Sequence, residues 1–276
     1  MMQSELIIIE EFLIPQLNRT RTLRIYLPMG YHLSEQAYPV LYMHDGQNVF
    51  EESTATYGMC WDAQTTLDEM QRLGKLSGLI VVAIDSSDEL DKMGRYNEYS
   101  PWKANANIKE LGVGDELLKF GGEGDEYMTF ISQTLKPYVD KKYRTKPSRE
   151  FTYLAGSSMG GLISLYGGCL YQNTFGAIGV FSPAFWFNKP SYFQYIKDTD
   201  FSYPIKIYMD MGTDEARDNT KVDFAGVYLS GSREVNELLT QKKNVTLFYQ
   251  EGDGHKHNEL AWSLRFPDFI DFIFRK

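Results

Sequence analysis

The stretch that most constrains this chain runs from 151 to 166, where a short β-type segment meets a glycine-serine turn and then a helical pattern. Its centre reads Gly156-Ser157-Ser158-Met159-Gly160, a G-x-S-x-G motif in the strand–turn–helix context that gives the motif its meaning. Such a turn holds the serine in a strained conformation at the C-terminal edge of a sheet, and the flanking glycines leave room for strand and helix. This context favours Ser158 as a nucleophile over a surface serine in a glycine-rich turn.

The rest of the chain alternates between strand and helix patterns. After β-type segments at 6–13 and 22–27, which look like a hairpin, buried strands are predicted at 38–44, 79–84, 151–155, 177–182, 205–210 and 245–249. Helical patterns lie between or after them at 62–73, 125–143, 190–197, 227–241 and 260–274. This order predicts an α/β fold with a mostly parallel sheet and helices on both faces. Because no linker or repeat interrupts it, we expect one domain over 1–276, with a single long irregular segment at 85–124.

Composition restricts the partners. Hydrophobic residues make up 43% of the chain, enough for a sizeable core, and the net charge of −9 argues against nucleic-acid or anionic-membrane surfaces. The two cysteines, Cys60 and Cys169, are expected to be reduced and structural. The N-terminus lacks the features of a signal peptide, and no apolar run approaches the ~20 residues of a membrane helix. We therefore expect a cytoplasmic, soluble protein, either a monomer or a homo-oligomer.

A nucleophilic serine needs a base. His255 and His257 lie in the predicted turn after the last strand, where the chain order serine, acid, histidine of α/β hydrolases puts the base. A solvated polar loop is the second interpretation. A metal-binding H-x-H pair is the third, and since no further ligand is evident we expect no metal. His44 precedes the serine in the chain, so we expect it to shape the turn around Ser158.

The acid that orients the histidine should follow a strand between the serine and the histidine. The segment 208–216 supplies three candidates. Asp210 is predicted within or at the end of the strand, and Asp214 and Glu215 are predicted in the turn beyond it. The residues alone leave Asp214 and Glu215 as alternatives.

Acyl transfer also requires N–H donors for the tetrahedral oxyanion. One donor is expected from Met159, the residue after the nucleophile. The other is expected from the turn after the strand at 38–44, which places Gly46 or Gln47 there.

Together these segments resemble the putative-esterase branch of the α/β hydrolases, which includes esterase D, feruloyl and acetyl esterases, enterochelin esterases and mycolyltransferases. The resemblance covers nearly the whole chain and rests on the motifs at 42–48, 99–102, 135–144, 155–161, 181–186, 211–215 and 257–262. It implies an α/β hydrolase fold without a large separate cap domain, and a Ser-acid-His hydrolase that needs no cofactor.

The resemblance also implies roles for individual residues. It marks Ser158 as the nucleophile, favours His257 over His255, and favours Glu215 as the acid with Asp214 as the alternate. The wall of the substrate pocket is expected from the segment 85–124, which includes Tyr99 and Trp102, and from Trp186.

The activity expected on these grounds is that of a serine carboxylesterase acting on a small-molecule ester with a short acyl chain, such as an acetyl, aryl or sugar ester. One alternative is an acyltransferase that passes the acyl group to a sugar or thiol. The other is a non-catalytic interaction protein on the same fold.

Overall fold

The computed structural model describes residues 3–89, 93–215 and 222–275. Its strands are β1 (Glu5–Ile14), β2 (Arg19–Leu27), β3 (Val40–His44), β4 (Ile80–Ile84), β5 (Thr152–Ser157), β6 (Ala177–Phe181), β7 (Ile205–Asp214) and β8 (Val245–Lys256). Its α-helices are α1 (Ala63–Arg72), α2 (Gly94–Glu98), α3 (Gly124–Phe130), α4 (Lys136–Lys142), α5 (Met159–Leu170), α6 (Lys189–Asp198), α7 (Phe224–Thr240) and α8 (Glu259–Phe274). Strands and helices alternate along most of the chain, as the sequence predicts.

The strands form one sheet in the order β1-β2-β4-β3-β5-β6-β7-β8. The N-terminal hairpin of β1 and β2 is antiparallel, β2 is also antiparallel to β4, and the remaining neighbours are parallel. The mostly parallel α/β hydrolase sheet expected from the sequence is therefore confirmed. Because parallel strands end at the same edge of a sheet, the loops after β3, β5, β6, β7 and β8 all reach one side of the molecule.

The central strands β3, β4, β5 and β6 bury both of their faces, whereas the edge strands β1 and β8 stay partly exposed. In β3, Val40 and Tyr42 belong to one apolar cluster, whereas Leu41 and Met43 belong to a second one on the opposite face. This alternation follows from the two-residue period of a strand. It explains why the run reads as continuously apolar in the sequence.

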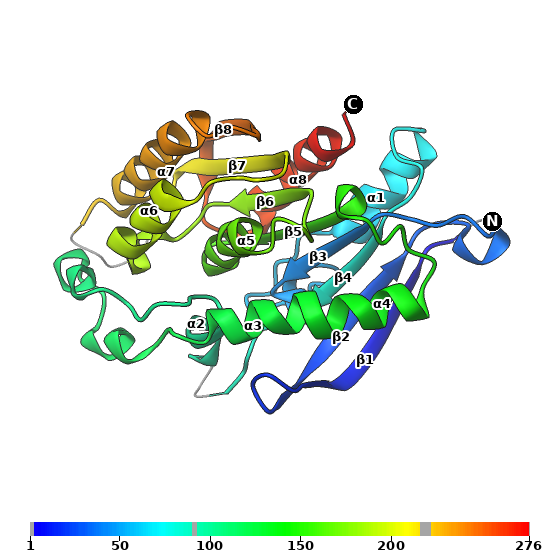
Figure 1. The fold of residues 1–276 in the computed structure, drawn as a ribbon, viewed down its shortest axis with the longest axis horizontal. Helices are drawn as coiled ribbons and strands as arrows, with labels where there is room; N and C mark the ends of the chain where they lie inside the picture. The colour runs from blue at the N-terminus through cyan, green and yellow to red at the C-terminus, as the bar shows by residue number, and fades with distance from the viewer. Residues whose placement is uncertain (1–2, 90–92, 216–221, 276) are drawn as a thin grey trace.

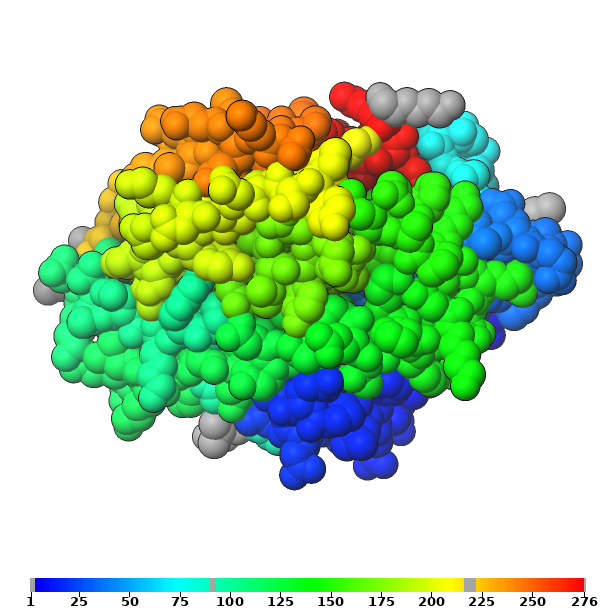
Figure 2. Space-filling model, viewed as in Figure 1, coloured from blue at the N-terminus to red at the C-terminus, as the bar shows by residue number. Residues whose placement is uncertain are grey.

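Helices cover both faces, as predicted. The first apolar cluster includes residues of α3, α4, α5, α6 and α7, and the second includes residues of α1 and α8. Figure 1 shows α3–α7 in front of the sheet and α1 and α8 behind it. In the space-filling view the front helices hide most of the sheet, while the blue hairpin of β1 and β2 protrudes below them (Figure 2).

Three details differ from the sequence-based expectations. The segment 85–124 contains α2 and two short 3₁₀ helices, Ala106–Leu111 and Asp115–Lys119. The helix expected over 125–143 is divided by a π-helical turn at Ile131–Leu135. β7 and β8 run further than expected, because their pairing continues past a register shift that follows Gly212.

Within the described ranges, no helix is long and apolar enough to cross a membrane.

Candidate active site

Five neighbouring strands deliver polar side chains to the same edge of the sheet. Asp45 follows β3, Ser158 follows β5, Ser182 follows β6, Glu215 follows β7, and His257 follows β8. The order of these strands in the sheet is also their order across the site. The topology therefore assembles residues that are more than 200 positions apart in the chain.

Ser158 occupies a sharp turn between β5 and α5. Its backbone has φ 59° and ψ −119°, a conformation that costs a non-glycine residue free energy. The turn is fixed by hydrogen bonds, because Ser158 N–H donates to the carbonyl of Phe181 at 2.9 Å and its own carbonyl accepts from Leu162 and Ala184 at 3.1 and 3.2 Å. The half-buried serine thus has the strained strand-to-helix geometry that the G-x-S-x-G motif predicts.

The glycines around the serine are required by close packing. A Cβ atom on Gly156 would lie 2.9 Å from the carbonyl group of Gly160 and 2.9 Å from Cδ2 of His44. A Cβ atom on Gly160 would lie 3.2 Å from Cβ of His44. His44 therefore packs against the turn, in the shaping role that we expected for it.

His44 is unsuited to act as a base near neutral pH. Burial, aided by the positive charge of Arg95, lowers the pKa of His44 to about 3. Its Nδ1 forms a 3.0 Å hydrogen bond with the hydroxyl of Tyr127. The imidazole is thus neutral and held in place by its surroundings.

His257 is hydrogen-bonded through Nδ1 to Oε2 of Glu215. An ionised carboxylate can only accept, so Nδ1 carries the hydrogen and Nε2 keeps its lone pair. Nε2 is the atom that could take a proton from a serine. The structure therefore brings the predicted base and the predicted acid together through Nδ1 of the histidine.

Glu215 is held from its other side as well. It is 1% exposed, and its Oε1 accepts hydrogen bonds from Ser182 Oγ at 2.6 Å and from the N–H of Gly212 at 2.7 Å. Burial opposes the ionisation of Glu215, but the hydrogen bonds and charge of His257 and the donors on Oε1 outweigh burial. The pKa of Glu215 consequently lies below its ordinary value.

The other candidates from the same segments lie elsewhere. Asp214 is exposed and is the last residue of β7, paired with Lys256, rather than part of a turn beyond the strand. His255 belongs to β8, and its Nδ1 lies 2.9 Å from Nη1 of Arg265. Both differences arise because β7 and β8 continue to pair beyond the predicted strand ends.

The two predicted sources of oxyanion donors lie in the turns that follow β3 and β5. Met159 is the first residue of α5, where N–H groups have no intrahelical acceptor. Gly46 and Gln47 begin a 3₁₀ turn whose first hydrogen bond, from Asn48 to the carbonyl of Asp45, is 2.8 Å long. The N–H groups of Gly46 and Gln47 precede that bond, and the choice between them stays a prediction.

Arg95, which the sequence did not single out, joins these two turns. Its guanidinium group binds the carboxylate of Asp45 in a bidentate pair, at 2.6 and 2.7 Å, and lies 3.5 Å from the carbonyl of Ser157. It comes from α2, inside the segment that the sequence showed only as irregular. A single planar side chain thus fixes the turn of Asp45 relative to the turn of Ser158.

Tyr228 is a second residue that the sequence did not indicate. It lies on α7, is 6% exposed, and has its hydroxyl 3.5 Å from Nε2 of His257. Burial raises the pKa of Tyr228, and the side chains of Trp186 and Ser158 oppose that rise. Helical periodicity explains its place on α7, but no motif marks it.

The three aromatic residues predicted for the pocket wall have different surroundings. Trp186 is nearly buried beside Tyr228, with ring centroids 6.5 Å apart. Trp102 is half-buried and packs edge-on against Tyr192 at 4.9 Å. Tyr99 is fully buried, and its hydroxyl accepts the N–H of Asp45 at 3.0 Å, so it supports the turn from inside the core instead of presenting a pocket surface.

The part of the chain that the structure describes contains no group of three or more His, Cys, Asp and Glu residues arranged to hold a metal ion. The δ-nitrogens of His255 and His257 have separate partners, Arg265 and Glu215. The H-x-H pair is thus divided between two different hydrogen-bond systems.

Comparison with known proteins places this architecture in context. The family model described as "Putative esterase" matches residues 14–272. The uncharacterized protein YbbA of Bacillus subtilis is 23% identical over 254 residues, which cover 88% of this chain and 92% of that protein.

Two solved structures share the fold. An IroE-like serine hydrolase from Shewanella oneidensis has a TM-score of 0.76 and 20% identity, covering 98% of this chain and 79% of that one. A ferulic acid esterase has a TM-score of 0.71 and 20% identity, covering 98% of both chains.

Proposed function

Since the chain belongs to the putative esterase family and is an ester-hydrolysing enzyme, we propose that it is a serine carboxylesterase acting through an acyl-enzyme. The observation that carries the proposal is the pairing of His257 with the buried Glu215 at the same sheet edge as the strained Ser158. A serine after β5, an acid after β7 and a histidine after β8 match the roles that this chemistry requires.

In the proposed reaction His257 Nε2 takes the proton of Ser158 as its Oγ attacks the ester carbonyl. The N–H of Met159, with that of Gly46 or Gln47, stabilises the oxyanion that forms. His257 then returns the proton to the leaving alcohol. Water attacks the acyl-enzyme by the same route in reverse, which releases the acid and restores Ser158.

We propose short or aryl acyl groups as the substrate class. Phe224 and Tyr228 pack edge-on against Trp186, with ring centroids 5.7 and 6.5 Å from it, and the hydroxyl of Tyr228 lies 3.5 Å from His257. Aromatic side chains next to the base are typical of sites for apolar and aryl ligands. The ferulic acid esterase of the same fold is named for an aryl acid, in keeping with this substrate class.

The test is hydrolysis of p-nitrophenyl acetate, butyrate and octanoate by the wild-type protein and by Ser158→Ala. We expect activity to fall with chain length and Ser158→Ala to lose more than about 10³-fold in kcat, since members of a triad act as a unit. A fluorophosphonate probe should label the wild type alone. Retention of most activity by folded Ser158→Ala would overturn the mechanism.

A further inference from the structure

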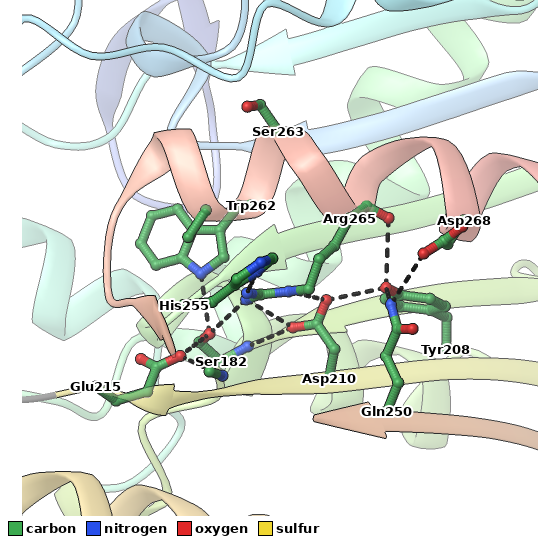
Figure 3. A network of polar contacts seen from close by, with 12 residues as sticks. Ser182, Tyr208, Asp210, Glu215, Gln250, His255, Trp262, Ser263, Arg265 and Asp268 are labelled. Atoms are coloured by element: carbon green, nitrogen blue, oxygen red, sulfur yellow. Dashed lines mark hydrogen bonds and ion pairs between the residues drawn. The ribbon is translucent and has the colours of Figure 1, made fainter. Parts of the chain in front are cut away.

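A buried polar network lies behind Glu215 (Figure 3). At its centre is Ser182, which directly follows β6, is 0% exposed and has φ 41°, a conformation unusual for serine. Its N–H donates to the backbone carbonyl of Asp210 at 3.0 Å and lies 3.3 Å from the Oδ1 of that residue. Asp210 on β7 therefore holds the backbone that presents Ser182 to Glu215.

The hydroxyl of Ser182 has three partners, and only one of them can accept its proton. Trp262 Nε1–H and Arg265 Nη2–H, both from α8, point at Ser182 Oγ from 2.9 and 3.1 Å. Indole and guanidinium nitrogens are donors only. They occupy the lone pairs of the hydroxyl, so its single hydrogen is directed at Glu215 Oε1, 2.6 Å away.

Arg265 is in turn held by Asp210. The Nε–Oδ2 and Nη2–Oδ1 distances are 2.8 and 3.2 Å, and both side chains are almost fully buried. Arg265 Nη1 also lies 2.9 Å from His255, and Tyr208 donates to Asp210 Oδ2 at 3.0 Å. Without Asp210, this buried cation would still be linked to the Glu215 carboxylate through the Ser182 hydroxyl.

We infer that Asp210 and Arg265 are positioning residues for the esterase reaction: they fix the Ser182 hydroxyl as a donor to Glu215 and keep the Arg265 cation from pairing with Glu215 in place of His257. The inference rests on the proposed function, because it concerns the acid of the same triad. The network assigns a role to an aspartate that the sequence offered only as a third candidate for the triad acid.

The first test removes the hydroxyl. Ser182→Ala should lower kcat for p-nitrophenyl acetate by about 10- to 100-fold, the value of one hydrogen bond to a charged group, with KM nearly unchanged. Tyr208→Phe is the matched control, since it removes a donor to Asp210 but leaves both bonds between Asp210 and Arg265. It should stay within about threefold of the wild type.

The second test is a rescue. Asp210→Asn should lower kcat by about 100-fold or more because Arg265 is then free to pair with Glu215. Adding Arg265→Gln removes the cation that would pair with Glu215, while Trp262 still donates to the Ser182 hydroxyl. The kcat of the double variant should therefore recover to within about tenfold of the wild type. If the network served stability alone, there would be no rescue, and kcat of the double variant would be no higher than kcat of Asp210→Asn.

Rates are compared per fluorophosphonate-titrated site, so that loss of folded protein does not count as loss of rate. If Asp210→Asn does not fold, Ser182→Ala and the double variant decide. Unchanged kcat in Ser182→Ala, or no rescue in the double variant, overturns the inference. The proposed function is unaffected by that result as long as the probe labels the wild type. Failure of the wild type to react with the probe overturns the proposed function instead.

Discussion

The hydroxyl of Tyr228 lies 3.5 Å from Nε2 of His257, the nitrogen that takes the proton of Ser158 in the proposed reaction. The rings of the two residues are also close, with centroids 4.8 Å apart. Because Nε2 carries a lone pair, Tyr228 is its donor in the free protein. Together with the bond from Nδ1 to Glu215, this contact holds the imidazole ring from both of its nitrogens.

Tyr228→Phe should therefore lower kcat/KM for p-nitrophenyl acetate by up to about tenfold, since one neutral hydrogen bond contributes about 1 kcal/mol. The measurement is the initial rate of the folded variant at several substrate concentrations. Tyr166→Phe, whose hydroxyl binds Asp125 away from His257, should stay within about twofold of the wild type. Equal rates in Tyr228→Phe and the wild type would show that this contact does not position His257.

Glu215 and Asp214 are neighbours in the chain with opposite environments, so they form a natural pair of test and control. Glu215→Gln keeps the shape of the buried side chain but loses the charge that stabilises protonated His257, and should reduce kcat by about 10³- to 10⁴-fold. Asp214 is exposed, and Asp214→Asn should stay within about twofold. Equal losses in the two variants, measured as initial rates, would contradict the assignment of the acid.

Gly156→Ala should damage the fold at the nucleophile turn. Its Cβ would meet backbone atoms of Gly160 at 2.9 Å, and backbone cannot move aside as a flexible side chain can. We expect a loss of about 1–3 kcal/mol in the free energy of unfolding, measured in urea, together with loss of activity.

Gly114→Ala is the control for the turn. Gly114 has φ −59°, and its nearest neighbour would be the Glu116 side chain at 3.4 Å. This change should alter the free energy of unfolding by no more than about 0.5 kcal/mol. A tolerated Gly156→Ala would show that the turn is looser than its packing indicates.

His44 should make stability depend on pH. The pKa of His44 is about 3 in the folded protein and about 6.5 in an unfolded chain, so between these values the unfolded chain binds a proton that the folded one does not. Stability is then lost as pH falls from about 6.5 towards 3, by up to about 1.4 kcal/mol per pH unit.

The comparison protein for this prediction is His44→Phe. As the pH is lowered from 7 to 5, its free energy of unfolding should fall less steeply than that of the wild type. Burial raises the pKa of Asp210 to about 6, which gives a dependence of opposite sign. That contribution is present in both proteins, so the difference between the two slopes isolates His44. Equal slopes would mean that His44 is not held neutral by burial.

The sequence by itself determined the class of the fold and singled out the candidate catalytic residues. Buried strands such as β3 read as continuous apolar runs because both faces are covered. The spacing of the glycines around Ser158 is also local in origin, because Gly156 packs against the backbone of Gly160. The order serine, acid, histidine along the chain was enough to predict Ser158 and the segments of Glu215 and His257, because the topology of the sheet fixes that order.

Only the tertiary structure decided which neighbouring residue reaches the site. Asp214 and Glu215 differ by one position, and the length of the pairing between β7 and β8 exposes the first and buries the second. Arg95, Tyr228 and Arg265 come from helices whose periodicity shows what they bury but not which loop they touch. Hydrogen bonds between elements distant in the chain leave no periodic or spacing signal, because they depend on how the sheet brings those elements together.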